Sequence, residues 1–104
     1  MDEINNLAKK YHSFKYPIGS KSAEWFDIKS DFELEDEALM SLVFQKEFSK
    51  IDKDKAVRYR TNIEEFKRKI YAYNPLNGTE EKEKSMLLKK VDIGLEIYKL
   101  IIDN

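Results

Sequence analysis

The chain offers few side chains that could perform catalysis. His12 is its only histidine and cysteine is absent, which excludes a cysteine nucleophile and a thiolate metal site. The sequence contains no G-x-S-x-G elbow, and no arrangement of serine, histidine and carboxylate stands out. His12 falls at the end of a predicted helix, where the helix dipole stabilises a cation, so we interpret it as structural. We therefore expect a protein that is not an enzyme.

Motifs for metals and cofactors are equally scarce. There is no E-x-x-H pair of the kind found in di-metal helical bundles, and the acidic run 31–37 lacks the alternating ligands and the glycine of a calcium loop. Gly19, Gly78 and Gly94 are isolated, whereas a phosphate cradle needs a glycine-rich turn that leads into a helix. We expect no metal and no cofactor.

Aromatic and acidic side chains in the N-terminal half form the best candidate for a binding site. Residues 24–37 carry a net charge of −6 and overlap an aromatic-rich segment. Protein interfaces commonly place aromatic anchors beside a charged rim. The predicted partner-binding residues are Tyr16, Trp25, Phe26, Asp31, Glu33, Glu35 and Asp36. The alternative is that Trp25 and Phe26 close one end of a helical core.

A basic segment further along the chain is the alternative binding site. Residues 50–69 carry a net charge of +4, which could compensate for the acidic segment or contact phosphates. The candidate nucleic-acid-binding residues are Arg58, Arg60, Lys67, Arg68 and Lys69. The isoelectric point near 5.9 and the lack of a short recognition helix argue against nucleic acid. On a helix, moreover, these bases would scatter over the polar circumference instead of forming one stripe.

The elements that would position these residues are helices. Apolar side chains at three- and four-residue spacing predict helices over residues 2–13, 54–73 and 79–103. A further helix is expected to start at Ser30 or Asp31 and to end near residue 49. The stretch before it is ambiguous, because residues 32–35 alternate between apolar and acidic side chains as a strand does. We interpret that stretch as irregular or as the first turn of the helix.

The last two predicted helices should form an αα-hairpin. Asp52 or Asp54 would start the first helix, and the short segment 74–78, Asn-Pro-Leu-Asn-Gly, would end it before Thr79 caps the second. The seam of the first helix consists of Ala56, Tyr59, Ile63, Phe66, Ile70 and Tyr73. The second is apolar over so much of its circumference that other elements must cover more than one side. Gly94 would allow one of them to approach closely.

Length and composition favour a small helical domain. The chain has 104 residues, of which 41% are hydrophobic and 38% charged, with three glycines and two prolines. We therefore predict an all-α fold, a single-domain helical bundle (1–104) of about four helices with the C-terminal αα-hairpin 54–73/79–103. No apolar stretch is long enough to span a bilayer, and the N-terminal residues lack the apolar core of a secretory signal. We expect a cytoplasmic location and no membrane partner.

These observations together favour a non-enzymatic protein-interaction module. By analogy of class, and not by a motif match, small helical proteins of this kind often act as stoichiometric binders or inhibitors, such as bacterial immunity, antitoxin or mobile-element-encoded inhibitor proteins. The partner would be another protein with a basic surface. The alternative is a nucleic-acid-binding or regulatory helical protein that uses residues 53–69. A homodimer through the last helix is expected if Ile93, Ile97 and Leu100 are exposed; if they are buried, the partner surface lies at Trp25 and its acidic flank.

Overall fold

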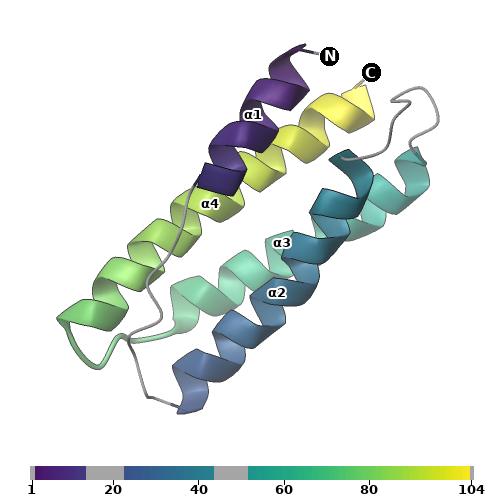
Figure 1. Cartoon of the computed structure of the whole chain (residues 1–104). Helices are drawn as coiled ribbons and strands as arrows, with labels where there is room; N and C mark the ends of the chain where they lie inside the picture. Colours follow the sequence, from purple (N-terminus) through teal and green to yellow (C-terminus); the bar gives the residue numbers. More distant parts are fainter. Residues whose placement is uncertain (1, 14–22, 44–51, 104) are drawn as a thin grey trace.

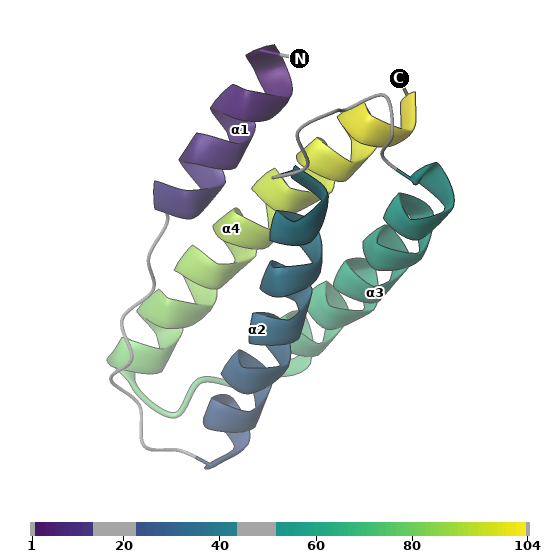
Figure 2. The ribbon, with the colours of Figure 1, turned by 45° about the vertical axis from the view of Figure 1, so that its right-hand side comes forward.

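The computed structural model of the chain, which describes residues 2–13, 23–43 and 52–103, contains an antiparallel bundle of four helices (Figure 1). The helices are α1 (Asp2–Ser13), α2 (Ala23–Val43), α3 (Lys53–Ala72) and α4 (Gly78–Asp103). Successive helices run in opposite directions and pack side by side, and α1 also packs on α4, which closes the bundle (Figure 2). The predicted all-α bundle with a C-terminal αα-hairpin is confirmed.

The seam predicted for α3 faces the core. Five of its residues are buried, and Tyr59 is half-buried. The buried ones are Ala56, Ile63, Phe66, Ile70 and Tyr73. Helix α4 buries side chains on several sides, because α1 and α3 both pack along it. Its broad apolar circumference is therefore covered within one chain.

Side chains from the other three helices all approach α4 closely at Gly94. An added Cβ there would lie 3.3 Å from a methyl group of Leu39, and 3.4 Å from both a methyl group of Ile63 and a ring carbon of Tyr11. These three residues belong to α2, α3 and α1. The expectation that Gly94 permits a close approach is confirmed: a Cβ there would already be at or slightly inside contact distance of all three neighbours, and a larger side chain would displace them.

The turn between α3 and α4 is stabilised by side chains that satisfy free backbone groups. Helix α4 starts one residue earlier than expected, and its cap is Asn77 in place of Thr79: the Asn77 side-chain oxygen accepts the backbone N–H of Glu80 at 2.9 Å. The buried Glu80 carboxylate in turn accepts the backbone N–H of Leu76 at 3.1 Å and the hydroxyl of Tyr73. This reciprocal arrangement resembles a capping box.

Polar side chains also bind free backbone groups at both ends of α3. As expected, Asp52 begins the helix: its carboxylate accepts the backbone N–H groups of Asp54 and Lys55 at 3.0 Å and 3.2 Å. At the other end, the ammonium group of Lys84 donates to the backbone carbonyl of Tyr73 at 2.7 Å. A cation at this position also interacts favourably with the helix dipole. The caps thus account for the sharp limits of α3.

Helix α2 is longer at its start than the sequence indicated. It runs without interruption from Ala23, so Ser30 and Asp31 lie inside the helix and neither caps it. The reason is visible in the burial pattern: Trp25, Phe32 and Leu39, seven residues apart, all face the core, which requires a helical period from the first turn. The expected end near residue 49 lies outside the described residues. Within the described ranges no helix is sufficiently long and apolar to span a bilayer.

Candidate protein-interaction surface

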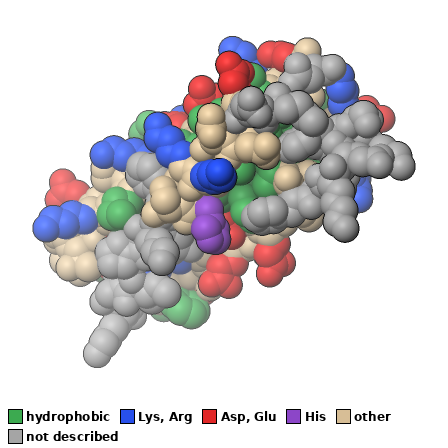
Figure 3. Space-filling view, turned by 45° about the horizontal axis from the view of Figure 1, so that its top comes forward, with side chains coloured by type: hydrophobic (Ala, Val, Ile, Leu, Met, Phe, Trp, Pro, Cys, Tyr) green, Lys and Arg blue, Asp and Glu red, His purple; other side chains and the backbone are tan. Residues whose placement is uncertain are grey.

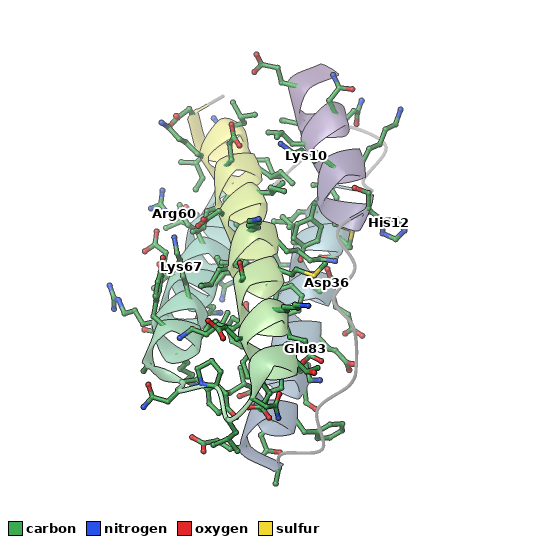
Figure 4. The ribbon with its side chains drawn as sticks, turned by 90° about the vertical axis from the view of Figure 1, so that its left-hand side faces the viewer. Lys10, His12, Asp36, Arg60, Lys67 and Glu83 are labelled. Carbon is green, nitrogen blue, oxygen red and sulfur yellow. The ribbon has the colours of Figure 1, made fainter. Side chains whose placement is uncertain are left out.

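Trp25 lies in the core and not on the surface. Its side chain is fully buried, it stacks on the ring of Tyr73 with 4.9 Å between ring centroids, and its indole N–H donates to the carboxylate of Glu83 on α4. Glu83 projects from the lower half of α4 toward α2 (Figure 4). Trp25 is therefore a core residue, as in the alternative interpretation, and not a surface anchor. We remove it from the candidate partner-binding residues.

Trp25, Lys29 and Glu83 form a buried polar layer. The ammonium group of Lys29 donates to the same carboxylate oxygen that the indole reaches, at 3.1 Å, and both charged side chains are almost completely covered. Burial of a carboxylate is costly unless donors surround it. Because the layer joins α2 to α4 across the bundle, it has a structural role.

The outer face of α2 combines apolar and acidic side chains. Phe26 is 55% exposed and Leu34 is 66% exposed, although both are large and apolar. Carboxylates surround them on the same exposed half of the helix. We define the outer face of α2 as Phe26, Asp27, Asp31, Glu33, Leu34 and Glu37. The predicted residues Phe26, Asp31 and Glu33 are thus all exposed on α2: Phe26 and Glu33, seven residues apart, share one side of the helix, and Asp31 lies on the side nearer α3.

Leu34 was missed at the sequence level. In a strand-like interpretation of residues 32–35, Phe32 and Leu34 share one face. In a helix, residues two apart point in nearly opposite directions, so the burial of Phe32 places Leu34 in solvent. Continuing the 3.6-residue period from Trp25 would have revealed this. Asp27 and Glu37 were recognised as part of the acidic segment but not as binding residues.

Glu35 lines a groove between α2 and α3. The groove has a volume of about 210 Å³. Its lining residues are Asp31, Leu34, Glu35, Asn62, Glu65, Phe66 and Lys69. Burial, and to a lesser extent the charge of Asp31, raise the pKa of Glu35, while Lys69 acts in the opposite direction. Asp31 and Leu34 belong both to this groove and to the outer face of α2, so the two surfaces are continuous.

Asp36 has a different environment from the other predicted acids. It is half-buried, and its charge acts on Lys90 and Tyr98 of α4, on the side of α4 opposite to Lys67 (Figure 4). Burial lowers the pKa of Lys90, and Asp36 partly offsets this effect. The Lys90 ammonium group also lies 4.6 Å from the centre of the Tyr11 ring. Asp36 is therefore partly covered and lies on the side of α2 that faces α4. Tyr16 lies outside the described residues.

The basic side chains of α3 are distributed over several faces. Arg60 pairs with Glu64 on the same helix at 3.7 Å, and Lys67 pairs with Asp92 of α4 (Figure 4). Lys69 lines the groove on the α2 side, while Arg58 and Arg68 are exposed. The basic side chains therefore do not form one stripe along α3. Nucleic-acid binding by this helix stays a prediction.

The last helix presents little free apolar surface at its predicted edge. Ile93 and Ile97 are buried within the single chain, and Leu100 is half-buried. With this edge largely covered, the acidic flank of α2 is the remaining predicted partner surface. The homodimer stays a prediction.

Groups suited to metal chemistry do not converge in the described part of the chain. No cluster of three or more histidine, aspartate or glutamate side chains there could hold a metal ion. His12 is exposed at the end of α1, with acidic side chains beside it (Figure 3). Comparison with protein-family models, curated proteins and solved structures finds no significant match to this chain. A functional conclusion therefore depends on the chemistry of the surfaces described above.

Proposed function

We propose that the chain is a non-enzymatic protein-interaction module, which covers a basic surface of a partner protein with the outer face of α2. Its mode of action would be that of stoichiometric inhibitors, the class that includes bacterial immunity proteins, antitoxins and inhibitors encoded by mobile elements. Inhibition follows from occlusion, because a partner surface covered by α2 is closed to its own substrate.

The observation that supports this proposal is the composition of the outer face of α2. Phe26 and Leu34 expose more than half of their surface among four exposed carboxylates. Apolar anchors surrounded by a charged rim are the usual anatomy of a protein interface. Charges in the rim would accelerate association with a basic surface and discriminate against acidic ones.

A rigid helix would carry this surface. Helix α2 is anchored on its inner side by Trp25 and Phe32 and by the Lys29–Glu83 ion pair, so the backbone that carries the outer side chains is held in place. A preorganised surface loses less conformational entropy on binding. Carboxylates in an exposed rim are screened by salt, so binding should weaken as ionic strength rises.

The test is affinity capture with the intact chain at low salt, followed by measurement of the captured protein's affinity for variants. In the double variant Glu33→Lys/Glu37→Lys the affinity should fall at least tenfold, because two attractive charges become repulsive. The matched control, Glu3→Lys/Glu96→Lys, makes the same change of net charge at exposed sites on α1 and α4. It should bind as the natural chain does.

Two results would contradict the proposal. One is equal affinity of the α2 variant and the control, which would show that only net charge matters or that the outer face is not used. The other is the failure of any protein to bind the immobilised chain at low salt. Circular dichroism of both variants establishes that each remains helical.

A further inference from the structure

The α2–α3 groove has the dimensions of a pocket for one side chain. Its volume of about 210 Å³ lies below the range of roughly 300–1,000 Å³ typical of small-molecule sites. Leu34 provides an exposed apolar wall. Phe66 reaches the groove from the core, where its ring packs against that of Phe32 with 5.6 Å between the ring centroids. The groove could therefore enclose a single long side chain along its apolar stem.

The polar lining of the groove favours a cation. Three carboxylates, those of Asp31, Glu35 and Glu65, face one ammonium group, that of Lys69. The carboxylates do not converge on one point, since the described residues contain no set of three that could hold a metal ion. Acidic groups spread along a groove suit an organic cation that donates hydrogen bonds in several directions.

We infer that the α2–α3 groove receives an arginine side chain of the partner. The inference rests on the proposed function, because the groove adjoins the outer face of α2 through Asp31 and Leu34. A guanidinium group has five N–H donors in a plane and can bind two carboxylates together. It is also less strongly hydrated than an ammonium group and tolerates apolar and aromatic neighbours, such as Leu34 and Phe66.

The state of Glu35 supports this assignment. Its carboxyl group is half-buried beside Asp31, and both burial and the neighbouring charge raise its pKa, since Lys69 compensates only in part. A carboxylate in this situation gains more from an incoming cation than a fully solvated one does. The amide of Asn62 offers a further oxygen acceptor in the same groove.

The test uses small blocked amino acids, so it does not require the partner. We would titrate the intact chain with Nα-acetyl-arginine N-methylamide and follow backbone amide shifts by NMR. The lysine and citrulline analogues serve as comparisons, because citrulline has nearly the shape of arginine without its charge. Shifts should be confined to the groove residues, with affinity at least threefold lower for the lysine analogue and no saturable binding for citrulline.

A matched pair of variants completes the experiment. Glu65→Gln removes one groove carboxylate and should lower the affinity for the arginine analogue at least threefold. Glu64→Gln alters the adjacent exposed residue, which pairs with Arg60 outside the groove, and should have no effect. The inference is overturned if citrulline binds as arginine does, if shifts spread over all acidic surfaces, or if both variants behave alike. None of these results bears on the Glu33→Lys/Glu37→Lys test, so the two proposals fail separately.

Discussion

Replacement of Gly94 by leucine should reveal how tightly the bundle packs where its four helices meet. Even a Cβ would stand 3.3 Å from Leu39 and 3.4 Å from Ile63 and Tyr11. The leucine side chain would add three further carbons, and all three neighbours are themselves core residues. The substitution therefore forces side chains away from their preferred rotamers or moves a helix.

Two opposing contributions set the magnitude. Overpacking a filled core typically costs about 1–3 kcal/mol. Removal of a glycine from a helix interior returns up to about 1 kcal/mol of helix propensity. Because the crowding comes from three helices, we take the upper part of the overpacking range, which leaves a net destabilisation of about 2 kcal/mol. This corresponds to a melting temperature lower by roughly 10 °C for a domain of this size.

The assay is urea and thermal unfolding followed by far-UV circular dichroism. The matched control is Gly78→Leu, the same substitution in the same helix at a position where an added Cβ meets nothing within 4 Å. That variant should retain the stability of the natural chain to within about 0.5 kcal/mol, as surface substitutions usually do. Equal stability of the two variants would refute the close packing of α1, α2 and α3 around Gly94.

Two further predictions concern buried polar groups. Lys29→Met should destabilise the fold by about 3 kcal/mol because it breaks the buried ion pair with Glu83, whereas Lys29→Met/Glu83→Gln should recover most of that loss. Urea unfolding of the single and double variants measures both effects, and an equal loss in both would contradict the stabilising role of the ion pair. Burial, followed by the charge of Glu35, raises the pKa of Tyr98 well above its ordinary value of 10.0. Above pH 10 the Tyr98 hydroxyl therefore ionises in the unfolded chain before it ionises in the folded one, and the stability of the fold decreases as pH rises. The Tyr98 hydroxyl has no hydrogen-bond partner among the described residues, so the Tyr98→Phe variant should be at least as stable as the natural chain at pH 7. Between pH 9 and about 11 the variant should lose less stability than the natural chain, because it has no hydroxyl to ionise there. A variant whose stability falls with pH as that of the natural chain does would count against this explanation.

The αα-hairpin could be predicted from the sequence because its signals are local. The seam of α3 repeats at three- and four-residue steps, and the segment 74–78 contains the residues that end one helix and begin the next. The cap of α4 was misplaced by two residues because Asn77 and Thr79 are both good caps. The choice of Asn77 depends on where Glu80 can reach back to Leu76, which is a matter of three-dimensional geometry.

The first half of α2 and the candidate site were harder to predict. Exposed Phe26 and Leu34 add apolar residues to the wrong face of the helix, which obscures its 3.6-residue period. Trp25 has two possible environments at the sequence level, and its actual hydrogen-bond partner, Glu83, is 58 residues away. A partner at that separation cannot be identified from local pattern, so the correct choice between anchor and core residue needed the structure.

The buried polar layer also limits the ways in which α2 can pack. A change of register would shift α2 along its neighbours by one helical turn, about 5.4 Å. Such a shift would separate Lys29 from Glu83, which are 3.1 Å apart, and would break their buried ion pair. The layer therefore favours the observed register, as does the close contact of Leu39 with Gly94. That register in turn determines which side of α2, with Phe26 and Leu34, points into solvent.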